Sequence, residues 1–132
     1  MDEYEIKVTD ERWRPVDKAM IQWELAGRRP VRVWALHNGR PPYPSGRYDT
    51  LAQAEVKIFE DDESGIEHAV IAMPVNGTSG GMRAELIPAF MEVLARASAI
   101  AAAANERIRA EVERAERLAA EAERAAVEAR AL

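Results

Sequence analysis

Alternating apolar and polar residues predict strands in the first half of the chain. In Tyr4–Thr9 the apolar side chains fall on one face and the charged ones on the other, which is typical of a half-buried strand. Val31–His37 alternates in the same way and is apolar on both faces after Arg32, which predicts a central strand. Ile66–Met73 is also apolar on both faces after His68, so we expect a third strand there.

Two segments allow more than one interpretation. Val16–Ala26 fits a helix that ends at Gly27, or a strand over Met20–Leu25 that turns into the next strand as a hairpin, and we favour the strand. In 49–62 the pattern fits a helix that begins near Thr50, or a strand. We favour a short helical turn near Thr50 followed by a strand.

The last fifty residues, 83–132, predict one long helix. They consist mainly of Ala, Glu, Arg and Leu and contain no Gly, and these residues lose little on entering a helix. Such a helix is about 75 Å long, which exceeds the core of a small domain. We expect its first turns, with the bulky residues from Leu86 to Leu94, to pack on the sheet. The remainder should pair with a second copy as a coiled coil or bundle, and the alternative is a solvated single helix.

A heptad register supports the pairing. One column is Ile87, Leu94, Ala101, Ile108, Ala115, Ala122 and Ala129, and its companion is Met91, Ser98, Asn105, Val112, Ala119 and Ala126. The sequence therefore predicts an α+β protein: a small antiparallel sheet domain in residues 1–82, followed by one long C-terminal Ala-rich helix in 83–132 that forms oligomers.

Charge is distributed unevenly, although the formal net charge is only −5. Residues 12–47 hold eight basic and two acidic side chains, a balance of +6, and residues 49–67 hold seven acidic and one basic, a balance of −6. This division fits a polar face for an anionic partner, and it fits equally a mutual neutralisation across neighbouring strands.

Two groups of residues are candidates for ligand binding. In the basic middle of the chain, Arg and aromatic side chains suit stacking and forked hydrogen bonds to a nucleotide-like ligand; the candidates are Arg28, Arg32, Trp34, Arg47 and Tyr48. Before the long helix, a Gly-rich segment offers backbone N–H groups, hydroxyls and a positive charge to an anion; the candidates are Thr78, Ser79, Gly80 and Arg83. Core packing of the Trp residues and simple capping of the helix are the alternatives.

Signatures of enzymes and metal sites are missing from the sequence. The chain has no Cys, and His37 and His68 are far apart along it, so we expect no catalytic residue, no metal site and no cofactor. No run of eighteen apolar residues occurs, and the N-terminus is acidic, so we expect no membrane partner and a cytoplasmic location.

The sequence favours a non-catalytic, homo-oligomeric binding protein of the small accessory or inhibitor type that sequesters or recognises a phosphate-bearing, nucleotide-like ligand. The first alternative is a protein–protein interaction or inhibitor module with no small-molecule site. A weak nucleic-acid binder ranks third, because the chain is acidic overall.

Overall fold

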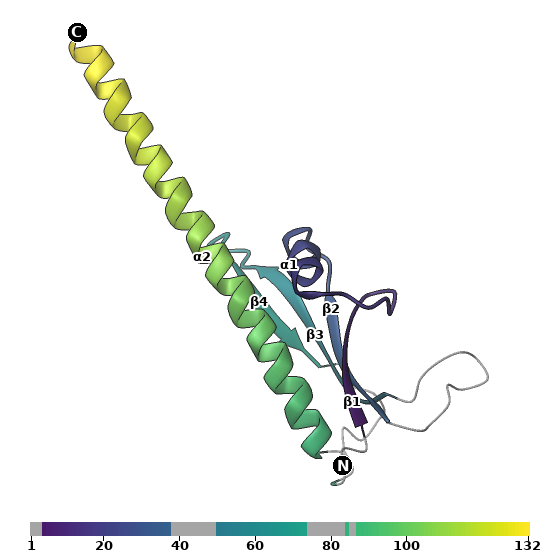
Figure 1. The fold of residues 1–132 in the computed structure, drawn as a ribbon. Coiled ribbons are helices and arrows are strands. Elements are labelled where there is room, and N and C mark those ends of the chain that lie inside the picture. The colour runs from purple at the N-terminus through teal and green to yellow at the C-terminus, as the bar shows by residue number, and fades with distance from the viewer. Residues whose placement is uncertain (1–3, 38–49, 74–83, 85–86) are drawn as a thin grey trace.

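The described part of the protein consists of a four-stranded antiparallel sheet, a short helix and one long helix (Figure 1). The computed structural model describes residues 4–37, 50–73, 84 and 87–132. Its elements are β1 (Tyr4–Asp10), α1 (Lys18–Ala26), β2 (Val31–His37), β3 (Thr50–Glu60), β4 (Glu67–Ala72) and α2 (Ile87–Ala131). The strands lie in the order β1-β2-β3-β4, so β2 is an inner strand as predicted, and the α+β class is confirmed.

The segment before β2 is a helix, and the expectation of a strand over Met20–Leu25 was wrong. The Asp17 carboxylate accepts a hydrogen bond from the Met20 N–H at 2.8 Å, which caps α1 at its start. Gly27 follows the last turn, and its N–H donates to the Trp23 carbonyl. Leu25 is fully buried whereas Trp23 is 67% exposed. Strand alternation places these two side chains on one face, and helical spacing separates them.

The strand β3 begins at Thr50, so the expected helical turn there was also wrong. Its inward side chains pair across the ladder with those of β2: Ala54 lies opposite Val33, and Val56 lies opposite Val31. These contacts are long-range, and they override the local resemblance to a helix start. At its far end β3 turns tightly into β4, where Gly65 adopts a positive φ of 70°.

The core lies between α2 and one face of the sheet. The sheet contributes Val31, Val33, Ala35, Ala52, Ala54 and Val56, and α1 adds Leu25. The buried column of α2 consists of Ala89, Val93, Ala97, Ile100, Ala101, Ala104 and Ile108.

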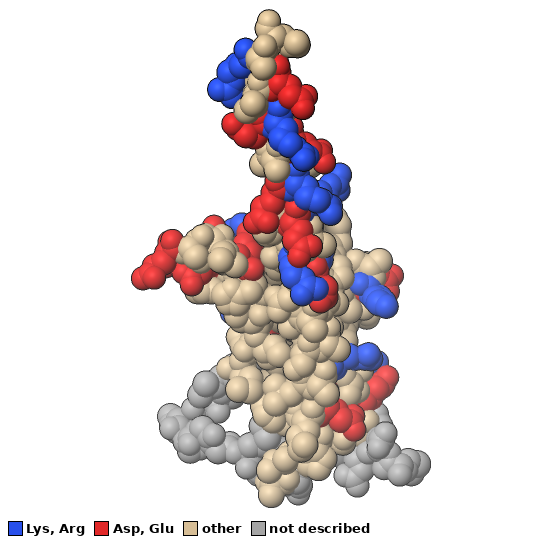
Figure 2. All heavy atoms as spheres, turned by 90° about the vertical axis from the view of Figure 1, so that its left-hand side faces the viewer, with Lys and Arg blue, Asp and Glu red and all other residues tan. Residues whose placement is uncertain are grey.

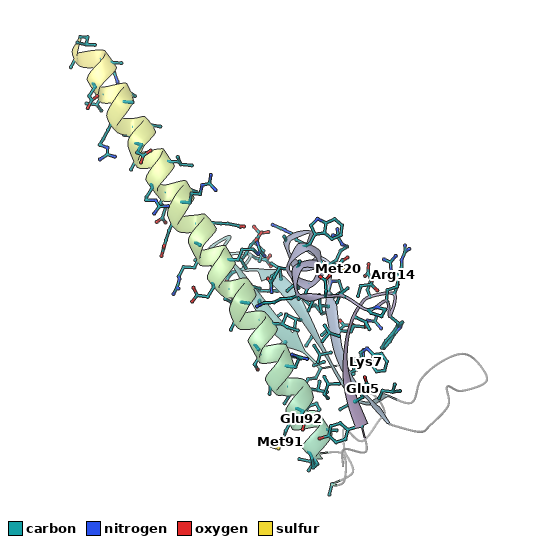
Figure 3. The ribbon with its side chains drawn as sticks, viewed as in Figure 1. Glu5, Lys7, Arg14, Met20, Met91 and Glu92 are labelled. Atoms are coloured by element: carbon teal, nitrogen blue, oxygen red, sulfur yellow. The ribbon has the colours of Figure 1, made fainter. Side chains whose placement is uncertain are left out.

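Packing of α2 therefore extends well beyond its first turns, as far as Ile108. The bulky Met91 near the helix start, by contrast, is 64% exposed (Figure 3). Small side chains on both surfaces let the helix approach the sheet closely, which explains why packing continues along the Ala-rich residues beyond Leu94.

Both edges of the sheet are partly covered. At the β4 edge, the Asn105 side-chain oxygen of α2 accepts a hydrogen bond from the Ala69 N–H at 2.7 Å. At the β1 edge, the chain folds back so that the Val16 N–H donates to the Val8 carbonyl. An uncovered edge strand presents unpaired backbone groups to other chains, and these two contacts reduce that exposure.

The extended packing of α2 predicts that Ala104→Leu destabilises the protein. Ala104 is fully buried between helix and sheet, and forcing a larger side chain into a packed core costs about 1–3 kcal/mol. Ala102→Leu is the matched control, because Ala102 is exposed on the same helix and Leu and Ala have similar helix propensities. Urea denaturation measures both free energies of unfolding. Equal values for the two variants would contradict packing at this level of the helix.

Candidate functional site

Arg32 and Trp34 form one cluster with Trp13 on the sheet face opposite α2. The Trp13 and Trp34 rings meet edge to face at 5.5 Å between centroids, and the Arg32 guanidinium lies 4.4 Å from the Trp13 centroid. The Trp34 Nε1–H donates to the Thr9 hydroxyl at 3.1 Å, and Trp34 is only 4% exposed. Trp13 is thus the accessible member of the cluster, at 44% exposure.

The turn that carries Trp13 is built around Asp10. The Asp10 carboxylate accepts from the backbone N–H groups of Arg12 and Arg14 at 2.8 and 3.0 Å, and from the Arg14 Nε–H at 2.8 Å. Arg14 lies beyond the end of β1 in Figure 3. Trp13 itself has φ of 65°, a conformation that costs energy for a bulky residue and that persists only when its surroundings impose it.

The pKa of Asp10 is lowered from its ordinary value. Burial of the carboxyl raises its pKa and is the largest single influence, but the backbone hydrogen bonds from Arg14 and Arg12, together with the side-chain hydrogen bond and charge of Arg14, outweigh it. The ionised form is therefore the one that the turn stabilises.

Acidic side chains of the sheet neutralise two of the predicted ligand residues. Arg28, which has φ of 60°, pairs with Glu60 at 3.3 Å and with Glu67. Arg32 pairs with Glu55 across the β2–β3 ladder at 3.4 Å. The mutual neutralisation of the basic and acidic segments is thus present in these pairs.

The predicted ligand residues do not form one group in the described structure. Arg32 and Trp34 come together through Trp13, on the face that carries Glu55. Arg28 pairs with Glu60 and Glu67, and the alternation of side chains along β3 and β4 places both acids on the face of the sheet that α2 covers. Arg28 therefore lies on the opposite side of the sheet from Arg32 and Trp34. The other candidates lie outside the described residues: Arg47, Tyr48, Thr78, Ser79, Gly80 and Arg83. A phosphate-binding site therefore stays a prediction from the sequence.

The C-terminal part of α2, residues 109–132, projects beyond the sheet, and we call it the arm (Figure 1). Every residue of the arm is exposed. The helix face that is buried as far as Ile108 nevertheless stays mainly apolar in the arm. At the same helical spacing it carries a stripe of Ala115, Leu118, Ala122, Ala125 and Ala129. One charged residue, Glu111, falls within this stripe. The surface that binds the sheet in the first half of α2 is therefore present, but uncovered, in the arm.

Charged side chains of both signs surround the stripe. Figure 2 shows Arg and Glu interspersed along the arm, whereas the outward face of the sheet-packed half is largely uncharged. Ion pairs within the helix join Arg107 to Glu111 at 3.1 Å and Arg109 to Glu106 at 2.6 Å. Each exposed pair contributes only about 0.3–0.5 kcal/mol, but together with the high Ala content they favour a helical arm.

The first of the two predicted heptad columns overlaps the buried column of α2 at Ala101 and Ile108. Its pairing with a second copy stays a prediction. The predicted companion column is instead exposed at Met91, Ser98 and Asn105. The central role of Asp10 was missed altogether. The available signal was an Asp followed four residues later by Arg14, in a short polar connection that contains a Trp.

Length and composition alone would also allow α2 to cross a membrane, and no other helix of the described chain passes that test. One third of its most apolar window, 33%, is buried inside the structure. The expectation of no membrane partner stays a prediction. Among the described residues, no group of three or more His, Cys, Asp or Glu side chains is placed to hold a metal ion.

Comparison with known proteins gives no match: no family model, no curated protein and no solved structure is significantly similar to this chain.

The environment of Asp10 predicts a pH-dependent contribution to stability. Because its pKa is lowered in the folded state, this contribution is complete above the ordinary carboxyl pKa and is lost as the pH falls through the lowered value. Asp10→Asn should therefore cost about 1–2 kcal/mol at neutral pH, and the difference from the wild type should shrink in acid. Urea denaturation across the pH range measures this difference. Glu11→Gln, which removes an exposed carboxylate from the same turn, is the control, and a difference for Asp10→Asn that stays constant with pH would refute the assignment.

Proposed function

We propose that the protein is a non-catalytic interaction module that assembles with further copies of itself through the arm. The observation that carries the proposal is the stripe from Ala115 to Ala129, which continues the sheet-binding column of α2 into solvent. A solvated helix needs no apolar stripe, whereas an amphipathic helix gains free energy when its stripe is covered.

The arm is suited to association because it is already helical. Ala, Glu and Arg favour the helix without any partner, and the first half of α2 is anchored on the sheet down to Ile108. Association then costs little backbone entropy, since no segment must fold on binding. An Ala-rich seam buries modest apolar area, so we expect assembly to depend on concentration.

A second copy is the partner that the charges of the arm fit best. Residues 109–132 hold six Glu and five Arg, which gives a balance of −1. A strongly charged arm would repel its own copy and select an oppositely charged partner. This nearly neutral arm, with both signs interspersed, is complementary to itself.

The interaction role also fits the three predicted ligand residues that the structure describes. Arg28 and Arg32 are paired with Glu60, Glu67 and Glu55, and Trp34 is buried with its N–H bonded to Thr9. A phosphate ligand would have to displace these carboxylates. Self-assembly is therefore the function that the geometry supports best, and docking of the sheet on a different protein is compatible with it.

Removing the arm should abolish self-association and leave the domain folded. A chain that ends after Ala110 keeps the whole buried column down to Ile108, so its sheet should retain its packing. Sedimentation velocity over a range of concentrations should give an oligomer for the full chain and a monomer for the truncated one, with circular dichroism to verify folding. A full-length chain that remains monomeric at high micromolar concentration would refute the proposal.

One charge on the stripe should have the same effect as truncation. Ala122→Glu places a carboxylate within the stripe, and Ala120→Glu places the same group on the opposite side of the helix. Both positions are exposed in the isolated chain, so neither substitution should alter its stability by more than about 0.5 kcal/mol. We expect the dissociation constant to rise at least about tenfold for Ala122→Glu only. Equal effects of the two substitutions would show that association does not use this stripe.

A further inference from the structure

The geometry points to an antiparallel pair of arms, with the two sheet domains at opposite ends. This inference rests on the proposed self-association and specifies its architecture. It follows from the position of the sheet on α2, from the length of the arm and from the order of its charges.

A parallel pair is sterically excluded by the sheet. The stripe of the arm lies on the same face of α2 as the buried column, and α2 is one continuous helix from Ile87 to Ala131 (Figure 1). Helices that pack together lie about 8–10 Å apart. In a parallel pair, Ala104 and Ile108 of one copy would face the same residues of the other across that distance. The sheet of each copy already occupies this space, because Ala104 is packed in the core against it and Ile108 is buried one turn further along the helix.

An antiparallel pair uses the full arm without this conflict. The arm has 24 residues, 109–132, and is about 36 Å long. When two arms overlap completely, the C-terminal Leu132 of each copy comes beside Ile108 of the other, where the sheet begins. In this stagger Ala115 faces Ala125 of the second copy, and Leu118 faces its Ala122. The larger Leu side chain thus meets a small one in each of the two central layers, which favours close packing.

Charges beside the stripe agree with this arrangement. Arg114 and Glu128 lie on the same flank, and in the antiparallel pair each Arg114 comes near Glu128 of the second copy. Near the symmetry axis, Glu121 of one copy approaches Glu121 of the other. The repulsion between two exposed carboxylates changes the free energy of association only slightly. A parallel pair would instead juxtapose Glu111 with its copy inside the seam.

Disulfide cross-linking tests the orientation directly, because the chain has no Cys. Two variants are needed, Ala115→Cys and Ala125→Cys, one of them labelled with a heavy isotope so that mixed and like dimers differ in mass. In the antiparallel pair each thiol faces the other variant's thiol. Two identical thiols lie ten residues apart along the axis, about 15 Å, far beyond the Cβ–Cβ separation of about 4.5 Å that a disulfide allows.

We expect oxidation of the equimolar mixture to give mixed disulfide dimers, and either variant alone to give few or none. If disulfide dimers between two chains of the same variant form as readily as mixed ones, the antiparallel pair is wrong, although self-association itself still holds. A dimer in sedimentation that yields no mixed disulfide would overturn it as well. A monomer in sedimentation would instead overturn the proposed function, so the two failures are distinguishable.

Discussion

The contact on which the structure depends is the close approach of α2 to one face of the sheet, mainly along β3 and β4. Small side chains form both surfaces: Ala97, Ala101 and Ala104 on the helix, and Val33 and Ala54 on the sheet. Each of them buries little area, but together they extend the contact over about six helical turns. This long contact fixes the direction of α2, and it therefore fixes the direction in which the arm leaves the domain.

Polar groups at the margins of this core have positioning roles. Asp10 organises the turn that places Trp13 over Trp34, and Asn105 satisfies an edge N–H of β4. Arg28 joins the end of α1 to acids of β3 and β4. The uneven charge of the sequence is therefore accounted for in part within the fold, where carboxylates and guanidinium groups meet across neighbouring elements rather than collecting on one surface.

The arm repeats outside the domain the pattern that α2 uses inside it. Along the first half of the helix an apolar column is covered by the sheet, and along the second half the same column is bare and flanked by Arg and Glu. One helix thus offers two similar surfaces, of which the fold covers only one. Because the sheet stands on the same side of the helix, it limits how a partner reaches the uncovered part. The position of the domain and the orientation of assembly are linked for this reason.

The sequence by itself determined the α+β class, the strands β1, β2 and β4 to within one residue at each end, and the long helix. Their periodicities follow from backbone geometry and are visible in any single segment. Tertiary structure decided what depends on contacts between distant segments. It made Lys18–Ala26 a helix that buries Leu25, and it began β3 at Thr50. It extended the packing of α2 to Ile108 because the partner surface is also made of small side chains. The alanines of α2 face several directions, so the sequence does not show which face is buried. Only the position of the sheet defines that face, and with it the apolar stripe that continues into the arm.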